Sequence, residues 1–413
     1  MAFSIDRDRL IKELEDLGRF NRTPEEGVTR FSFSPEDGMA REYLLSIFAS
    51  MGLKVSVDGA GNMRARLEGS DPDAPAVLSG SHIDTVLHGG CYDGTVGTLG
   101  ALEAVRAIAE SDLPHRHPIE VIVFSEEEGS NFGSTLSGSK ALVGKYSLED
   151  MENLKDPEGK SMAEMARDAG YEPETMADFL LRPGDIRAMV ELHVEQSVVL
   201  ESMGVPVGIV EAVAGIRVVE IRMKGTANHA GATPMTLRRD PLVAAAHIMA
   251  QIETLARGSG TGTTVATVGK IACFPNVSNI IPGEIRFTVE IRDVKAAGIQ
   301  SVLDGISALA PAIAASRDIS LEIISVSDSD PVQLDGDIAS LSEECAAKRD
   351  IPCVRMNSGA VHDACMLAPI VATGMLFIPS RGGRSHVPEE YSDPDDIEKG
   401  VSLLADVLYE LAR

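Results

Sequence analysis

The stretch Gly80–Gly97 constrains the fold more than any other, because it joins a buried strand to a helix through a turn rich in polar residues. Its sequence reads GSHIDTVLHGGCYDGTVG. The short apolar run Ala76–Ser79 before it is typical of a buried strand, and Thr95–Glu110 after it repeats apolar residues at helical spacing. We expect His82 just past the carboxyl end of the strand and Asp93 just before the helix. In open α/β sheets, this edge is where ligands bind.

Length and composition favour a globular protein of two domains. The 413 residues exceed what one ordinary core needs. The chain has 63 acidic and 37 basic residues, and this excess of negative charge argues against nucleic acid or an anionic membrane as a partner. The five cysteines are an odd number without CxxC spacing, which fits a reducing compartment. Met1–Leu17 lacks an apolar signal-peptide core, and no uncharged apolar run approaches the roughly 20 residues of a membrane helix. We therefore expect a cytoplasmic protein.

Three further apolar segments end in polar residues of the same chemical kind. Ile119–Phe124 is followed by three adjacent glutamates, Ala188–Leu192 by His193, and Ile370–Ile378 leads to His386. Adjacent carboxylates at a strand end repel one another unless cations are present. Four separate segments thus deliver His, Asp or Glu at one kind of boundary, which is hard to attribute to histidines of the core.

The pattern changes between roughly Glu211 and Pro331. Three segments there alternate apolar and polar residues, as half-exposed antiparallel strands do, and two long helical patterns intervene. Two helices over one face of such a sheet make an α+β domain. The predicted organisation is an α/β catalytic domain built from residues 1–211 and 331–413, with an inserted domain at 212–330.

The candidate metal ligands are imidazoles and carboxylates, namely His82, Asp93, Glu128, His193 and His386. These donors suit Zn, Mn, Co or Ni, and the absence of cysteine argues against a closed structural zinc site. Five ligands are too many for one catalytic ion with an open position, but a bridging carboxylate lets them hold two ions. Asp93 is the natural bridge, and the pairing of the other four with the two ions stays open.

Two ions about 3.5–4 Å apart can share and activate a water, which predicts hydrolysis of an amide-like bond. Glu127 is adjacent to Glu128 but points elsewhere along an extended chain, so it is the candidate general acid/base that moves a proton to the leaving nitrogen. Asp84 could accept the second N–H of His82 and orient the ring. A loop-capping role is the alternative for Asp84.

Eight motifs in a fixed order between Gly27 and Glu390 carry a resemblance to a known family. They are GVTRFSFSPED, GSHIDTVLHGGCYDGTVG, EEEGSNF, ELHVEQ, HAGATPM, NIIPGEIRFTVEIRD, SGAVHDA and SHVPEE. The chain resembles the amidase/hydantoinase/carbamoylase family of dinuclear metallohydrolases, which includes N-carbamoyl-L-amino-acid hydrolases, β-ureidopropionases and allantoate amidohydrolases. The resemblance implies an aminopeptidase-like, mixed-sheet catalytic domain. It puts the five candidate ligands on the family's metal positions, Glu127 on its catalytic glutamate and Asp84 on its orienting aspartate.

The resemblance also implies that the inserted domain is a lid and dimerisation domain, and hence a homodimer. His229 in HAGATPM matches a catalytic histidine that reaches the partner subunit's site, binds substrate and stabilises the oxyanion. Asn279 and Arg292 match positions that hold the substrate's carboxylate, and Gln196 matches one near the carbamoyl group. An Arg fork suits bidentate carboxylate binding. The other matched positions line the substrate pocket, namely Gly359, Ala360 and His362.

The predicted reaction is hydrolysis of the linear C–N bond of an N-carbamoyl-L-amino acid to the L-amino acid, ammonia and carbon dioxide. The predicted cofactors are two divalent ions per subunit, Mn²⁺ or Zn²⁺, with Co²⁺ and Ni²⁺ as alternatives. Asn131 and Val361 stand where the family usually has Arg and Gly. Neither change removes a ligand, but both leave the substrate open.

Four alternative substrates share the same chemistry: allantoate, β-ureidopropionate, ureidoglycolate and an N-acyl amino acid. A dinuclear aminopeptidase or dipeptidase is a second class, since related hydrolases share the HxD and EE motifs. His193 in ELHVEQ and the pair Asn279 and Arg292 speak against it. A third class is a metal-binding protein without catalysis, against which the presence of Glu127 speaks.

Overall fold

The structure of the protein is a computed structural model that describes residues 3–413. The chain folds into two compact units. Unit 1 comprises the chain up to Glu211 together with Leu334–Met356 and His362–Arg413, and unit 2 comprises Ala212–Gln333 and Asn357–Val361. Each unit is described by itself.

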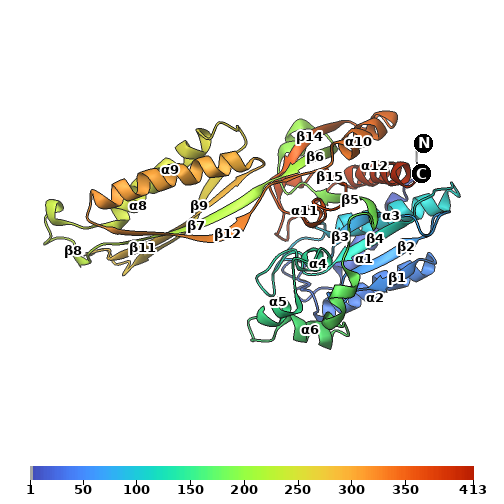
Figure 1. Cartoon of the computed structure of the whole chain (residues 1–413), viewed down its shortest axis with the longest axis horizontal. Coiled ribbons are helices and arrows are strands. Elements are labelled where there is room, and N and C mark those ends of the chain that lie inside the picture. Colours follow the sequence, from blue (N-terminus) through green and yellow to red (C-terminus); the bar gives the residue numbers. More distant parts are fainter. Residues whose placement is uncertain (1–2) are drawn as a thin grey trace. The chain divides into compact units, whose positions relative to one another are not determined.

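The main sheet has nine strands (Figure 1). Its order is β1 (Lys54–Val57), β2 (Met63–Leu67), β4 (Ile119–Phe124), β3 (Ala76–His82), β5 (Ile186–Val194), β15 (Thr373–Ile378), β6 (Val207–Val213) and β13 (Val332–Gln333), with β14 (Cys353–Ser358) also beside β6. The four central strands are mutually parallel, whereas β1, β2 and β6 pair antiparallel. The predicted α/β class with a mixed sheet is therefore confirmed.

The central strands β3 and β4 are buried along their whole length, and most of their residues outside the carboxyl end of β3 are apolar. Side chains alternate between two cores. Val77 and Val190 face the core with the long helices, and Leu78 and Met189 face a smaller core on the other side. The long helices are α1 (Arg7–Gly18), α2 (Pro35–Ser50), α3 (Thr95–Glu110) and α12 (Pro394–Ala412).

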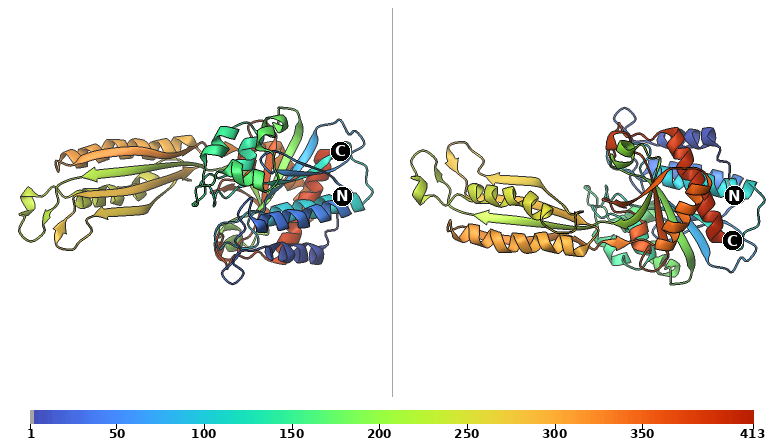
Figure 2. Two further views of the ribbon diagram at one scale, coloured as in Figure 1. Left: turned by 90° about the horizontal axis from the view of Figure 1, so that it is seen from below. Right: turned by 90° about the horizontal axis from the view of Figure 1, so that it is seen from above.

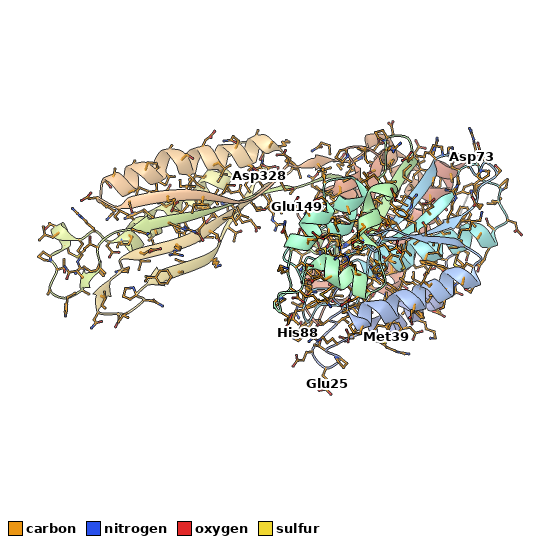
Figure 3. All side chains as sticks on the ribbon, turned by 60° about the horizontal axis from the view of Figure 1, so that its bottom comes forward. Glu25, Met39, Asp73, His88, Glu149 and Asp328 are labelled. Carbon is orange, nitrogen blue, oxygen red and sulfur yellow. The ribbon has the colours of Figure 1, made fainter. Side chains whose placement is uncertain are left out.

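The helix α2 shows how an amphipathic pattern becomes a surface helix. Ala40, Leu44 and Phe48 are fully buried, whereas Met39 is 46% exposed (Figure 3). The shorter helices of unit 1 are α4 (Ser137–Leu142), α5 (Leu148–Asn153), α6 (Met162–Asp168), α7 (Val199–Met203), α10 (Gly336–Lys348), α11 (Ala364–Leu367) and the 3₁₀ helices η1 (Pro173–Phe179) and η3 (Arg381–Gly383).

The strand predicted to end at Ser79 is longer in the structure, because β3 continues through His82. Ser79 Oγ donates to the carbonyl of Val190 at 2.7 Å, and His82 pairs in register with Phe124 of β4. Polar residues can extend a buried strand when the neighbouring strands satisfy their hydrogen bonds. The apolar run alone therefore placed the strand end too early, and His82 is the last residue of the strand rather than a residue just past its end.

Unit 2 is an antiparallel sheet covered on one face by two helices (Figures 1 and 2). The sheet order is β12 (Ser320–Ser329), β7 (Gly215–Lys224), β11 (Glu284–Asp293) and β9 (Val265–Phe274), and the helices are α8 (Pro241–Arg257) and α9 (Ala296–Ala315). Two short strands, β8 (Asn228–His229) and β10 (Ile280–Ile281), pair beyond one end of this sheet, and η2 (Met235–Leu237) follows β8.

One helix among the described residues, α9, is long and apolar enough to cross a membrane by length and composition alone. Its residues Ile299, Val302 and Ile306 are buried in the core of unit 2 against the sheet and α8. One face of α9 therefore packs within this unit.

Candidate active site

The five candidate ligands lie at the carboxyl ends of the parallel strands. Two of them belong to strands, since His82 ends β3 and His193 is the next-to-last residue of β5. The others stand in the segments that follow a strand or precede a helix: Asp93 before α3, Glu128 after β4 and His386 after β15. Parallel strands bring these segments, which are far apart in the chain, to one edge of the sheet.

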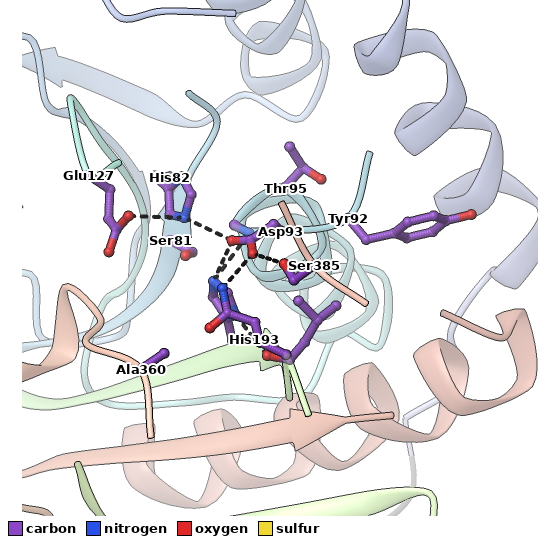
Figure 4. Close-up of polar contacts among 12 residues, drawn as sticks. Ser81, His82, Tyr92, Asp93, Thr95, Glu127, His193, Ala360 and Ser385 are labelled. Atoms are coloured by element: carbon purple, nitrogen blue, oxygen red, sulfur yellow. Dashed lines mark hydrogen bonds and ion pairs between the residues drawn. The ribbon is translucent and has the colours of Figure 1, made fainter. Parts of the chain in front are cut away.

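The carboxylate of Asp93 lies at the centre of the cluster (Figure 4). Its Oδ1 is 3.5 Å from Nε2 of His82 and 3.3 Å from Nε2 of His193. Its Oδ2 is 3.4 Å from Nε2 of His386, whose Nε2 is also 3.5 Å from Oε1 of Glu128. The two oxygens of Asp93 thus face two different sets of donors.

Potential ligand atoms within each set lie no more than 4.8 Å apart. One set is His82, Asp93 and His193, and the other is Asp93, Glu128 and His386. Imidazole nitrogen and carboxylate oxygen are donors that suit divalent transition metals. The chemistry of the donors therefore fits a pair of ions with Asp93 shared between them.

The ring nitrogens of the two strand histidines have fixed roles. Nδ1 of His82 donates to the main-chain carbonyl of Asp84 at 2.9 Å, and Nδ1 of His193 donates to that of Val194 at 2.9 Å. The N–H of Gly94 donates to Nε2 of His193 at 3.2 Å. Both rings are therefore oriented through Nδ1 by a main-chain carbonyl and turn Nε2 toward the carboxylate of Asp93.

Gly94 allows this packing because no side chain fits at its position. A Cβ there would lie 2.4 Å from the imidazole of His82, and the φ of Gly94 is 64°. A residue with a side chain would therefore both strain the backbone and displace the ring.

The carboxylate of Asp84 differs in its contacts from the expectation. It lies 3.7 Å from Nδ1 of His82, which bonds instead to the main-chain carbonyl of the same aspartate. Its two oxygens accept the main-chain N–H groups of Glu127 at 3.2 Å and Glu128 at 3.1 Å. Asp84 therefore holds the turn that carries both glutamates, and it orients His82 through its backbone.

Glu127 is buried beside the histidines, with Oε2 3.7 Å from Nε2 of His82. Burial raises the pKa of Glu127 well above its usual range. Burial also raises the pKa of Glu128 to about 7, and the hydrogen bond with Asp93 raises the pKa of His386 to about 9. Burial alone would raise the pKa of Asp93, but His193 and the other imidazoles hold it well below its usual range. Burial thus disfavours the charged form of both glutamates, and a bound cation would favour that form.

Gln196 adjoins the same cluster. Its Nε2 donates to Oδ2 of Asp93 at 2.6 Å and lies 3.3 Å from Nε2 of His386. Its Oε1 is buried and has no hydrogen-bond partner among the described residues. A buried amide oxygen without a partner is costly, so this atom is available to a donor that enters the site.

His362 is also brought to the site, with its ring centroid 4.5 Å from that of His193. Burial lowers the pKa of His362 well below its usual range, so the ring is neutral. Glu191, which the sequence reasoning missed, adjoins both rings, because one of its carboxylate oxygens lies within 4.8 Å of a ring nitrogen of His193 and of His362. Glu191 is fully buried and accepts hydrogen bonds from Ser81 Oγ at 2.7 Å and from the N–H of Ala364 at 2.9 Å. The sequence did carry a signal for it: Glu191 lies two residues before His193 in ELHVEQ, and side chains two apart on a strand point to the same face.

The remaining predicted residues belong to unit 2. Nδ1 of His229 accepts the N–H groups of Gly231 at 3.1 Å and Ala232 at 3.2 Å, so Nε2 carries the proton and is a donor. The carbonyl of Asn279 accepts the N–H of Ala230 at 2.9 Å, which keeps Asn279 beside this loop.

Arg292 lies at the other end of the unit 2 sheet. Its register partner is Ile216 at the start of β7, whereas His229 and Asn279 lie beyond the opposite end of β7. The strand from Glu284 to Arg292 is extended, so the two ends are about 27 Å apart.

Arg292 lies beside two further predicted pocket positions. Its Nη1 donates to the carbonyl of Gly359 at 2.6 Å. The next residue, Ala360, donates its N–H to Ser358 Oγ at 3.1 Å. Unit 2 therefore carries its candidate substrate residues in two groups, His229 with Asn279 and Arg292 with Gly359 and Ala360.

Comparison with known proteins gives matches over nearly the whole chain. The model of peptidase family M20/M25/M40 matches residues 78–410. The chain is 41% identical to an N-carbamoyl-L-amino acid amidohydrolase of Geobacillus stearothermophilus, over 99% of each chain. It is 36% identical to an allantoate amidohydrolase of Escherichia coli, over 98% of each chain.

A solved structure agrees with these sequence matches. The crystal structure of an amidase of the hydantoinase/carbamoylase family from Burkholderia multivorans has a TM-score of 0.94 at 32% identity, covering 99% of this chain and 98% of that one. The resemblance carried by the eight motifs is therefore confirmed. The chain belongs to peptidase family M20/M25/M40, and within it this protein is an amidohydrolase that acts on C–N bonds other than peptide bonds.

Proposed function

We propose that this amidohydrolase is a cytoplasmic N-carbamoyl-L-amino-acid hydrolase that uses two divalent metal ions per subunit. The observation that carries the proposal is the position of Asp93, whose two oxygens face separate sets of histidine and glutamate donors. Enzymes of the M20 family use a pair of divalent ions, and this cluster could hold them. The relative that is 41% identical carries the name of this activity.

In the proposed site, His82 and His193 would hold one ion, Glu128 and His386 would hold the other, and Asp93 would contribute to both. The pair, Mn²⁺ or Zn²⁺ by the donor chemistry, would lower the pKa of a shared water and polarise a substrate oxygen. The protein's part is to fix the donors. The Nδ1 hydrogen bonds of the two strand histidines perform that task for the first ion.

Glu127 is the proposed general acid/base. It is buried, and its Oε2 lies 3.7 Å from Nε2 of His82, where a carboxylate can take a proton from water and give it to a leaving nitrogen. Asp84 accepts the main-chain N–H of Glu127 and so fixes the backbone position from which the Glu127 side chain extends. Gln196 would offer its unpartnered Oε1 to the N–H groups of a carbamoyl substrate.

The substrate's carboxylate would bind Arg292 and Asn279. Because the strand from Glu284 to Arg292, about 27 Å long, lies between these two residues in one subunit, a single carboxylate can contact both only if two subunits contribute. This separation supports a homodimer in which unit 2 acts as the lid and dimerisation domain. His229 would then donate from Nε2 to the oxyanion in the partner's site, where His362 also lines the pocket.

A panel of substrates tests the proposal. Ammonia release is measured after Mn²⁺ loading with N-carbamoyl-L-amino acids, their D enantiomers, allantoate, β-ureidopropionate, ureidoglycolate, N-acetyl-L-amino acids and dipeptides, with amino-acid release followed for the last two. The fastest turnover is expected with an N-carbamoyl-L-amino acid. Cleavage of N-acyl amino acids or dipeptides alone would overturn the carbamoyl assignment.

Allantoate is the second candidate substrate, because an allantoate amidohydrolase is 36% identical over nearly all of both chains. The same panel separates the two activities. A kcat/KM for allantoate above that for every carbamoyl amino acid would favour the second candidate.

A further inference from the structure

The carboxylate of Glu390 joins two segments of unit 1 that are far apart in the chain. Its Oε1 accepts the main-chain N–H groups of Tyr92 at 2.8 Å and Asp93 at 2.9 Å. Its Oε2 accepts the hydroxyl of Ser385 at 2.8 Å and the N–H of His386 at 3.4 Å. One side chain, only 5% exposed, therefore bonds to the backbone of a candidate ligand on each segment.

Two other residues shape this contact. Ser385 Oγ also lies 2.5 Å from Oδ2 of Asp93, so the hydroxyl connects both carboxylates (Figure 4). Gly90 leaves the space that Glu390 fills, since a Cβ on Gly90 would lie 2.3 Å from its Oε1. The fit is thus specific to a glycine at one position and a carboxylate at the other.

The His386 segment needs such a tie more than the two strand histidines do. His82 and His193 are buried in strands of the main sheet, where the ladder fixes their backbone. The side chain of His386 is 46% exposed, it stands outside the helices and strands, and its φ is 61°, a sparsely populated region for a residue with a side chain. Its backbone must therefore be held by contacts from elsewhere in the fold.

We infer that Glu390 is a positioning residue that fixes His386 relative to Asp93 and thereby sets the affinity of the half-site of Asp93, Glu128 and His386. The inference rests on the proposed function, because it takes these three residues as ligands. It adds that this half-site, and not the one with His82 and His193, depends on Glu390. Groups that orient metal ligands from behind are typically worth 10–100-fold in metal affinity.

The test titrates the full chain, first stripped with EDTA, with Mn²⁺ by isothermal calorimetry. Glu390→Ala removes all four hydrogen bonds, and Gly90→Ala displaces the carboxylate without changing it. Both are expected to weaken the second Mn²⁺ about 10–100-fold and to leave the first within about threefold. Glu390→Gln keeps an oxygen for Tyr92 and Asp93 but turns an NH₂ group toward the N–H of His386, so it should also weaken the second Mn²⁺ and leave the first within about threefold.

Glu389→Ala is the matched control, because Glu389 is 64% exposed and lies 3.8 Å from Arg384, away from these contacts. It should bind both ions as the wild type does. The EPR spectrum of the loaded protein gives a second measure: a spin-coupled pair in wild type and Glu389→Ala, and an isolated Mn²⁺ in Glu390→Ala at equal metal.

Each outcome decides the matter. Unchanged affinities in Glu390→Ala, or equal weakening of both ions, overturn the inference and leave the proposed function standing. If Glu390→Ala does not fold by circular dichroism, Gly90→Ala decides, and failure of both to fold makes the contact a folding element and overturns the inference. A wild type that binds no pair of ions overturns the proposed function and the inference together.

Discussion

Asp84 and Glu127 are joined by a hydrogen bond of 3.2 Å in which the main-chain N–H of Glu127 donates to Oδ1 of Asp84, 43 residues earlier in the chain. The other oxygen of the same carboxylate accepts the N–H of Glu128 at 3.1 Å. One buried side chain therefore aligns two consecutive glutamates, of which one is the proposed acid/base and the other a proposed ligand.

Asp84→Asn should lower turnover because an amide has only one oxygen to accept two N–H groups. One of the glutamate N–H groups then faces an NH₂ group and loses its partner in a buried place. We expect kcat to fall about 10–100-fold with the fold retained, measured by steady-state kinetics and circular dichroism. The same exchange at exposed Asp73 (Figure 3) should change nothing. A wild-type kcat in Asp84→Asn would contradict the role of Asp84 in aligning the two glutamates.

Glu127→Gln should separate metal binding from catalysis. The amide keeps the size of the side chain but cannot carry the proton, so we expect turnover to fall at least about 100-fold. Two equivalents of Mn²⁺ should remain, measured by elemental analysis after gel filtration. A variant with unchanged turnover would exclude Glu127 from the mechanism.

Mixing two inactive variants should restore activity if His229 serves the partner's site. A heterodimer of His229→Ala and Glu127→Gln has one site that lacks both groups and one that has both. We therefore expect up to about a quarter of wild-type activity after random exchange of subunits, since half of the dimers are mixed and each has one intact site of two. Mass spectrometry of differently tagged subunits verifies the exchange, and its success without any recovery of activity would contradict a shared site.

The stability of the metal-free protein should fall as pH rises from about 6.5 to 9. The hydrogen bond with Asp93 raises the pKa of His386 from 6.5 to about 9, so the folded chain binds more protons than the unfolded chain in this window. The contribution of His386 is fully present below pH 6.5 and is lost as pH rises through 9. Metal affinity changes in the opposite sense, because the ligand must lose its proton.

Urea unfolding at several pH values, with EDTA and with Mn²⁺, measures both effects. The gap in the free energy of unfolding between loaded and metal-free protein should widen as pH rises. In His386→Ala the slope of the metal-free protein should be shallower. Parallel pH curves for the loaded and metal-free wild type would contradict this account.

The sequence predicted those features that depend on local patterns. Thr95–Glu110 and Ile119–Phe124 match α3 and β4, because apolar spacing and burial agree there. The candidate ligands also converge, since each stands at the carboxyl end of a strand in a parallel set or in the segment that follows it. Ligand types at repeated strand boundaries are therefore a strong signal for one common site.

Contacts that involve the backbone could not be predicted in the same way. His82 bonds to the carbonyl of Asp84, and nothing in the residue types decides between that carbonyl and the carboxylate. Glu191 and Glu390 are buried by strand pairing and loop packing, whereas glutamate is an exposed residue by type. Ser81 donates a hydrogen bond to Glu191, and Gly90 leaves the space that Glu390 fills. Both partners are distant in sequence from the glutamate that they contact.

The order of the segments along the chain has a consequence for biosynthesis. Four of the five candidate ligands precede unit 2, and His386 follows it, in the last of the three segments of unit 1. A ribosome therefore exposes an incomplete donor set throughout the translation of unit 2. A nascent or C-terminally truncated chain would have the histidine pair on the strands and Asp93, but neither His386 nor the carboxylate that ties it down. Metal acquisition in the cell would thus be completed only by a finished polypeptide.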